Sequence, residues 1–151
     1  MGYSLILLKY IKEIGGAMMD TKSTVEIITE WDIVAARQLG RNEAKAIGFG
    51  AVDQARITTA ISELARNIYL YARAGEVTIE QISNGDKTGI RIVAKDKGPG
   101  INNLKKVMED GYSTSGGLGA GLPGVKRLMD SMDIQSSEGN GTIVVIEKWM
   151  Q

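Results

Sequence analysis

The chain has 151 residues, enough for one domain, and its 18 Lys and Arg balance 18 Asp and Glu, which gives no electrostatic reason to expect nucleic acid or an anionic membrane as a partner. It contains no cysteine and no histidine, which excludes disulfides, thiolate metal sites and phosphohistidine chemistry. Any acid–base work therefore falls to Asp, Glu, Lys or Tyr.

The first twenty residues differ in character from the rest. Residues 5–8 (LILL) are apolar, but the run is too short to span a bilayer, and no signal-peptide cleavage site follows it. We therefore expect a cytoplasmic protein, with a domain at residues 21–151 preceded by an N-terminal extension at residues 1–20, either a short helix or a disordered tail. A further hypothesis is that Gly15–Met18 is a translated ribosome-binding sequence, so that the native chain begins at Met18 or Met19.

A strand and two helices are predicted next. Residues 24–29 (TVEIIT) alternate and are rich in β-branched side chains, which predicts a strand. Thr29 and Asp32 have the spacing of a capping box, and helical periodicity continues to about Ile47. A second helix is predicted from about residue 51 to residue 71. Its apolar stripe consists of Ile57, Ile61, Leu64 and Ile68.

The second half of the chain is rich in strands and glycine. Residues 76–82 and 89–95 are predicted to form a hairpin, because the pair Asn84-Gly85 between them favours a tight turn. The elements expected after it are a short helix at 103–109, a glycine-rich loop at 110–121, a helix at 122–132, and strands near 133–137 and 142–149. This order predicts an α+β two-layer sandwich, with helices on one face of a mostly antiparallel, mixed sheet.

Glu63 and Asn67 lie one turn apart on the second predicted helix, so their side chains are neighbours. For such a pair taken alone, a polar helix surface is the plain interpretation. The functional interpretation is that the amide oxygen of Asn67 ligates Mg²⁺, which takes oxygen ligands, while Glu63 accepts or orients the proton of an attacking hydroxyl.

Asp96 directly follows a predicted strand and opens the sequence Asp-Lys-Gly-Pro-Gly. The plain interpretation is a polar β-turn. In the functional interpretation, the carboxylate accepts a hydrogen bond from a buried ligand, such as the amino group of adenine. Gly98 and Gly100 then allow the backbone to pack against the base without a Cβ in the way.

The glycine-rich segment from Ser113 to Gly124 runs into the helix predicted to start at Leu122. A flexible surface loop is the plain interpretation. The free N–H groups and the positive dipole end of a helix start suit phosphate oxygens, and glycine lets several N–H groups converge on one anion. The segment is neither a P-loop nor a Rossmann turn, because it lacks their residues and placement.

The motifs become specific in combination. Glu63 and Asn67 on a helix, Asp96 after a strand, a glycine loop opening a helix, and Gly141-Thr142 at a closing strand resemble the pattern of the GHKL ATPases over essentially all of residues 21–151. Within that superfamily the sequence resembles most the small anti-sigma-factor-like serine/threonine kinases. The stretches that carry this second resemblance are residues 30–38, 53–69 and 111–122.

The resemblance implies the Bergerat fold, a site for ATP with Mg²⁺, and a role for each motif residue. Asn67 would ligate Mg²⁺, and Glu63 would be the catalytic base. Asp96 would hold the adenine amino group, and Thr142 would lie near adenine through water. The remaining contacts would come from Gly98 and Gly100 and from an ATP lid made of Ser115, Gly116, Gly117, Gly119, Ala120, Gly121 and Leu122.

The resemblance also implies an activity and partners. It predicts a kinase that transfers the γ-phosphate of ATP to serine or threonine of STAS-domain proteins in a stressosome core. It further predicts a partner-switching regulator that activates a PP2C-type phosphatase in stress signalling, with a homodimer possible because the related anti-sigma factors dimerise. The alternative is a nucleotide-gated protein-binding switch with little kinase activity.

Overall fold

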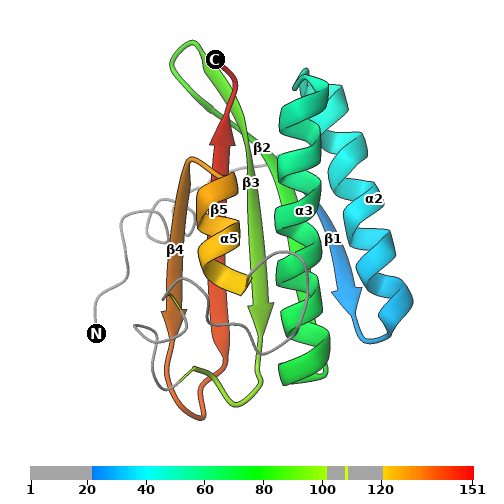
Figure 1. Ribbon diagram of the computed structural model, residues 1–151, viewed down its shortest axis with the longest axis vertical. Coiled ribbons are helices and arrows are strands. Elements are labelled where there is room, and N and C mark those ends of the chain that lie inside the picture. Colours follow the sequence, from blue (N-terminus) through cyan, green and yellow to red (C-terminus); the bar gives the residue numbers. More distant parts are fainter. Residues whose placement is uncertain (1–21, 102–107, 109–120) are drawn as a thin grey trace.

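The computed structural model describes residues 22–101, Met108 and residues 121–151, which form one sheet covered by helices (Figure 1). Along the chain the elements are β1 (Lys22–Ile27), α2 (Glu30–Ile47), α3 (Ala51–Asn67), the π-helix η1 (Ile68–Ala72), β2 (Gly75–Asn84), β3 (Lys87–Asp96), α5 (Gly121–Leu128), β4 (Ser131–Ser136) and β5 (Thr142–Trp149). Among these residues, no helix has the length and apolar character that crossing a membrane requires.

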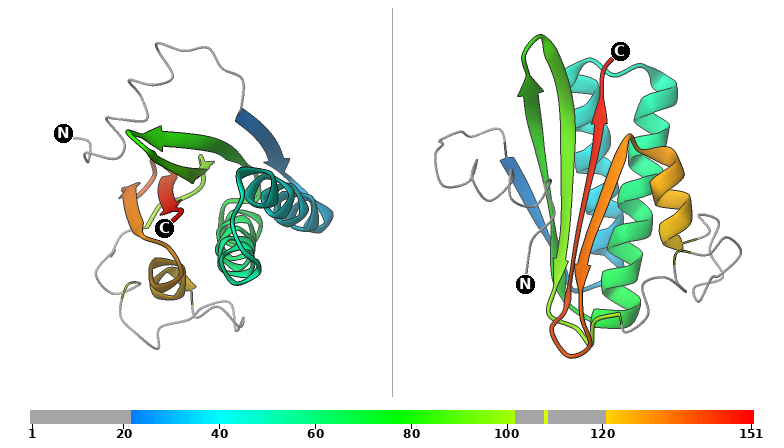
Figure 2. Two further views of the ribbon diagram at one scale, coloured as in Figure 1. Left: turned by 90° about the horizontal axis from the view of Figure 1, so that it is seen from above. Right: turned by 90° about the vertical axis from the view of Figure 1, so that its left-hand side faces the viewer.

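The sheet has five strands in the order β1-β2-β3-β5-β4. Helices α2, α3 and α5 all lie on the same side of it, as the view from above in Figure 2 shows. This arrangement confirms the predicted α+β two-layer sandwich. Every pairing between the described strands is antiparallel, so this part of the sheet is not mixed.

The hydrophobic core lies between the sheet and the helices. The predicted stripe of α3 is confirmed, because Ile57, Ile61 and Leu64 are buried there. They pack with alternate residues of the central strands, since every second side chain of a strand points to the same face. The core residues of β3 and β5 are Ile90, Ile92, Ala94, Val144 and Ile146. Full burial of each large aliphatic side chain contributes roughly 1.5–3 kcal/mol.

The predicted capping box at the start of α2 is supported by its hydrogen bonds. The carboxylate oxygen Oδ2 of Asp32 accepts from the backbone N–H of Thr29 at 2.7 Å and from that of Ile28 at 2.9 Å. The strand before it, β1, begins and ends two residues earlier than the alternation predicted. Backbone N–H groups at the start of a helix have no carbonyl partner within the helix, and a side-chain acceptor such as the Asp32 carboxylate satisfies them.

The predicted hairpin of β2 and β3 is confirmed, and its strands extend into the connection expected between residues 82 and 89. Asn84 pairs with Lys87, so Gly85 and Asp86 form the two-residue tip. Gly85 has a φ of 64°, a left-handed conformation that glycine adopts without steric cost. A two-residue loop with this geometry follows the twist of the two strands.

The second predicted helix does not continue as a regular α-helix to Tyr71. It ends at Asn67 and continues as the π-helix η1, which closes at Arg73, where the backbone N–H donates to the carbonyl of Ile68 at 2.8 Å. Arg73 has a φ of 70°, the one positive value among the described non-glycine residues. The wider turn packs against β2 and β3, and the helical spacing of residues 51–71 carries no information about these contacts.

The C-terminal elements follow the prediction with shifted ends. Helix α5 stops at Leu128, four residues earlier than predicted, because β4 already begins at Ser131. Strand β5 has the predicted bounds. The predictions for residues 1–20, for the short helix at 103–109 and for most of the loop at 110–121 lie outside the described residues.

Candidate functional site

One end of the sheet carries a row of aligned residues that are small or polar on every strand except β1. The register aligns one residue from each strand in this row, which consists of Ile27, Gly75, Asp96, Thr142 and Ser136. Each polar member lies two positions from a residue that belongs to the core or packs against it. These pairs are Asp96 with Ala94, Thr142 with Val144 and Ser136 with Ile134. Side chains two positions apart share a face, so the polar groups of the row point toward the helix layer.

Asp96 is half-buried at the end of β3. Burial raises the pKa of its carboxyl above the ordinary value, although hydrogen bonds from the backbone N–H groups of Gly98 and Thr142 act in the opposite direction. The Gly98 N–H donates to Oδ1 at 2.9 Å. A carboxylate that loses water without gaining a full set of donors is poised to accept a hydrogen bond from a ligand.

Two glycines allow the chain to approach Asp96 closely. A Cβ on Gly98 would lie 2.5 Å from Cβ of Ala72, the last residue of η1. A Cβ on Gly75 would lie 2.8 Å from the Ile68 side chain and 2.9 Å from Cβ of Asp96. The end of η1 therefore rests against the row at positions where any side chain would displace it.

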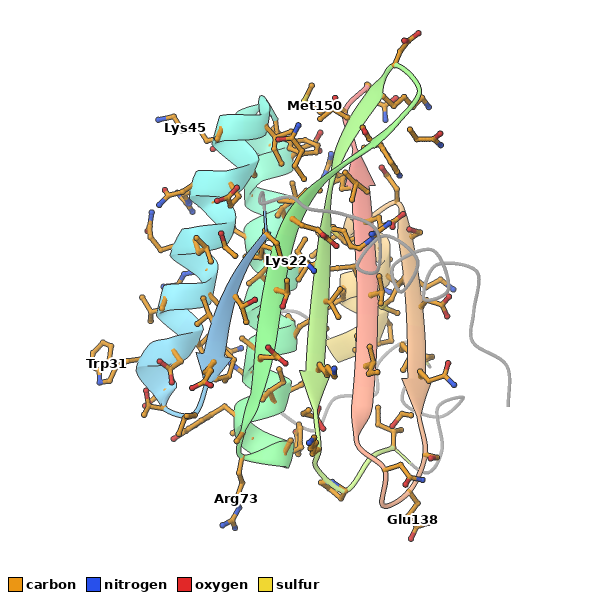
Figure 3. All side chains as sticks on the ribbon, turned by 180° about the vertical axis from the view of Figure 1, so that it is seen from behind. Lys22, Trp31, Lys45, Arg73, Glu138 and Met150 are labelled. Atoms are coloured by element: carbon orange, nitrogen blue, oxygen red, sulfur yellow. The ribbon has the colours of Figure 1, made fainter. Side chains whose placement is uncertain are left out.

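The loop after β3 also contacts the turn between β4 and β5. The backbone N–H of Gly139 donates to the carbonyl of Pro99 at 2.7 Å, and Gly100 lies against the carbonyl of Ser137. Figure 3 labels Arg73, which follows η1, and Glu138, which lies in that turn, at the same end of the molecule. Three segments distant in sequence thus surround one end of the sheet.

Glu63 and Asn67 lie in the last turns of α3, which η1 continues toward the same end. The Glu63 side chain is 4% exposed, and its Oε1 lies 3.5 Å from Nη1 of Arg66. Its other oxygen, Oε2, is buried and has no hydrogen-bond partner among the described residues. A buried carboxylate oxygen without a donor is costly in a folded protein, and a ligand that brings a donor would remove that cost.

The structure thus brings Asp96, Gly98, Gly100 and Thr142 together at one end of the sheet. Gly121 and Leu122 form the start of α5, where Leu122 is buried in the core. The other predicted lid residues, Ser115, Gly116, Gly117, Gly119 and Ala120, lie outside the described residues. Sequence reasoning missed Gly75 and Ser136, since nothing local to either marks it; only the strand register brings them beside Asp96 and Thr142.

A metal ion at this end would need ligands beyond protein carboxylates. Within the described ranges, no group of three or more acidic, histidine or cysteine residues is arranged to hold one. The half-buried amide of Asn67 can supply one oxygen, and Mg²⁺ commonly completes its shell with water and phosphate oxygens. The residues present therefore fit a magnesium ion that arrives with a phosphorylated ligand.

Comparison with known proteins agrees with this geometry. Residues 52–151 match the model of the family described as "Histidine kinase-, DNA gyrase B-, and HSP90-like ATPase". Because this match covers well over half of the chain, including Glu63, Asn67, Asp96 and Thr142, the chain belongs to that ATPase family. Its fold is also similar to that of the mycobacterial sensor histidine kinase MprB, with a TM-score of 0.52, 20% identity, and coverage of 84% of this chain and 96% of that one.

More specific similarity comes from curated relatives. The chain is 65% identical over 133 residues to serine/threonine-protein kinase RsbT of Bacillus subtilis (strain 168), covering 88% of this chain and 100% of that protein. It is 31% identical over 139 residues to the anti-sigma F factor of Clostridium beijerinckii, covering 87% and 96%. This similarity places the chain among the RsbT-type serine/threonine-protein kinases of the family, and so among enzymes.

A solved structure of the RsbU and RsbW domains of a Mycobacterium tuberculosis protein has a similar fold. The TM-score is 0.58 at 20% identity, and the match covers 85% of this chain but 33% of that one. At this identity the likeness concerns the fold alone.

Proposed function

We propose that this protein binds ATP with Mg²⁺ at the Asp96 end of the sheet and transfers the γ-phosphate to a serine or threonine hydroxyl of a partner protein. The observation that carries the proposal is the pair of carboxylates at this end. Asp96 is half-buried with a raised pKa, and Glu63 is buried with one oxygen unpartnered. The adenine amino group would supply a hydrogen-bond donor to Asp96, and the hydroxyl of the partner's serine or threonine would supply one to Glu63.

The base of the nucleotide would lie at the row. The Asp96 carboxylate would accept from the adenine amino group, and Thr142 would contact the base directly or through water. Gly98 and Gly100 shape the loop beside it, with Gly98 held against Ala72 and Gly100 against Ser137. The protein's own atoms occupy the space beside both glycines, so Gly98 and Gly100 shape the loop, and the side chains of Asp96 and Thr142 are left to meet the base.

The phosphates would lie toward α3 and the start of α5. The amide oxygen of Asn67 would ligate Mg²⁺, which neutralises phosphate charge when it is bound. The predicted lid, Ser115 to Leu122, runs into α5, which begins at Gly121. The free N–H groups and the dipole of a helix start favour anions. Phosphoryl transfer depends mainly on such positioning and charge neutralisation.

Glu63 would act on the attacking hydroxyl. Its unpartnered Oε2 can accept the hydroxyl proton, while its Oε1 lies 3.5 Å from Nη1 of Arg66. The serine or threonine of the partner would then attack as a positioned, partly deprotonated nucleophile.

The proposed substrates are STAS-domain proteins of the RsbS and RsbR kind, and the second partner is a PP2C-type phosphatase of the RsbU kind. One relative named above, the anti-sigma F factor, supports a partner-switching role. The surface offers an apolar patch at the start of α2, where Ile28 is 55%, Val34 42% and Trp31 80% exposed. Figure 3 shows Trp31 projecting away from the molecule. This patch could serve a partner or a second copy in a homodimer.

Replacing Glu63 by Gln tests the proposal. Loss of the proton acceptor should slow transfer by about 10²–10⁴-fold while ATP still binds. The assay incubates the protein with γ-labelled ATP and a STAS-domain partner, and calorimetry measures nucleotide affinity. Asn67→Ala should lose magnesium-dependent ATP binding and transfer together. Glu30→Gln, an exposed change in the first turn of α2, is the matched control.

The outcomes separate the two candidate functions. Label on the partner from the wild-type protein, lost with Glu63→Gln, supports a kinase. Nucleotide-dependent complex formation with no label on the partner instead supports the binding switch. Full transferase activity of the Glu63→Gln protein would contradict the role of Glu63 as the base.

A further inference from the structure

Ser136 joins three segments at the row. Its hydroxyl oxygen accepts from the backbone N–H of Ile101 at 2.8 Å and donates to the carbonyl of Gly141 at 2.9 Å. It also lies 2.8 Å from the hydroxyl oxygen of Thr142. Ile101 follows the Asp96 loop, and Thr142 is the neighbour of Asp96 in the register, so Ser136 ties both to the end of β4.

Counting protons fixes the direction of the hydrogen bond between the two hydroxyls. A serine hydroxyl has one proton and two lone pairs. Because a carbonyl can only accept, the Ser136 proton goes to Gly141, and one lone pair receives the Ile101 N–H. The remaining lone pair can only accept, so the Thr142 hydroxyl must be the donor of the bond to Ser136.

Thr142 is thereby left with no proton to offer a ligand. Its oxygen can still accept, as can the ionised carboxylate of Asp96 beside it in the row. Two neighbouring groups that only accept are satisfied by an exocyclic amine, which carries two N–H donors. An oxo group in the same place has no proton to donate, so a 6-oxo purine offers at this edge only its single N1–H, in place of the two N–H donors of the amine.

We propose that Ser136 is a positioning residue that holds the Thr142 hydroxyl as an acceptor, so that the site selects 6-amino over 6-oxo purine nucleotides. This inference rests on the proposed function, because it assumes that the base binds at the row. In this inference Ser136 touches no ligand itself and sets the specificity for the base through the Thr142 hydroxyl.

The test compares ATP with inosine triphosphate, which carries an oxo group where ATP carries the amine. Titration calorimetry gives the dissociation constant of each, and their ratio measures discrimination. Ser136→Ala frees the Thr142 proton, which can then be donated to the oxo group, so the ratio should fall by roughly 5–10-fold, the equivalent of one hydrogen bond. Ser136→Thr keeps a hydroxyl and should preserve most of the discrimination.

The neighbouring serine supplies a matched control. Ser137 is exposed, and its hydroxyl accepts from the Asn140 side chain within the turn at 2.7 Å, so Ser137→Ala should leave the ratio unchanged. Thr142→Val removes the oriented hydroxyl and should lower the ratio. In the Thr142→Val variant, adding Ser136→Ala should not change the ratio further, because the Thr142 hydroxyl that Ser136 orients is absent.

A merely structural role for Ser136 predicts a different pattern. If Ser136→Ala weakens both nucleotides equally and leaves the ratio unchanged, the inference is wrong. Should that variant fail to fold, an unchanged ratio in Thr142→Val would also overturn it. Wild-type protein that binds both nucleotides equally refutes the inference but leaves the proposed function standing, whereas wild-type protein that binds neither refutes both.

Discussion

At the scale of single residues, Asp96 shows a conflict between stability and ligand binding. Its carboxyl is partly removed from water, and this burial raises its pKa above 3.8. The folded protein then holds the Asp96 proton more tightly than the unfolded chain does. As pH rises through the window between 3.8 and the raised pKa, the ionised carboxylate costs stability, and that cost persists at higher pH. A ligand donor is the partner that would compensate it.

Asp96→Asn separates the two effects. The amide oxygen can still accept from the Gly98 N–H, but the buried charge is gone, so the melting temperature of the ligand-free protein at pH 7 should rise. ATP affinity should fall by about 1–3 kcal/mol, since the amide is a weaker acceptor. Thermal melts from pH 7 down to 4, together with calorimetry, check both; the melting temperatures should converge as Asp96 becomes protonated. A lower melting temperature at pH 7 would contradict this account.

At the scale of elements, the junction of α3 and η1 positions the site. The α-helix holds Glu63 and Asn67 one turn apart, and the π-helix then brings Ile68 and Ala72 against Gly75 and Gly98. Short π-helical segments are uncommon and are often found at functional sites. The first helix of the layer, α2, is stabilised at its start by Asp32.

Replacing Asp32 by Ala should lower the melting temperature at pH 7, because the N–H groups of Ile28 and Thr29 lose their acceptor. These bonds lower the pKa of Asp32 below 3.8. Its contribution is therefore present above pH 3.8 and is lost as pH falls through the folded-state pKa, so the difference between variant and wild type should shrink in acid. Glu30→Ala, in the same first turn, controls for the helix dipole. A difference that persists unchanged at low pH would argue against capping by the ionised carboxylate.

At the scale of the whole molecule, the sheet has two different faces. The helix side is apolar, whereas the other side carries Arg91, which is fully buried between Glu147, at 2.8 Å, and Glu80, at 3.4 Å. Val93 and Val145 are buried on the same side in a small cluster of their own. The central strands therefore depend on an ion network as well as on the main core.

Arg91→Met should destabilise the protein by about 3–5 kcal/mol, because it leaves the nearly buried Glu147 carboxylate without its counter-charge. Urea unfolding monitored by circular dichroism measures the change. Lys95→Met, an exposed position on the same face of β3, is the control and should stay within about 0.5 kcal/mol of wild type. A loss below about 1 kcal/mol for Arg91→Met would mean that the network contributes little.

The predictions that succeeded depend on local patterns. Helical spacing placed Glu63 and Asn67 on one helix, and the spacing of Thr29 and Asp32 marked the start of α2. Alternation identified β1, and the pair Asn84-Gly85 indicated the hairpin of β2 and β3. Each of these signals lies within a few residues, so propensity and periodicity suffice to read it. The π-helix and the shifted ends of β1 and α5 were missed, because helix packing and strand register decide them.

By itself, the sequence determined the two-layer class, the helix with its carboxylate and amide, and a strand with Asp96 directly after it. Only the tertiary structure decided that Ser136 meets Thr142, that Gly75 makes room for Ile68, and that Arg91 is buried between two glutamates. The physical reason is that these contacts join residues far apart in the chain. Their existence depends on strand register and close packing across the whole sheet, and no short stretch of sequence encodes either.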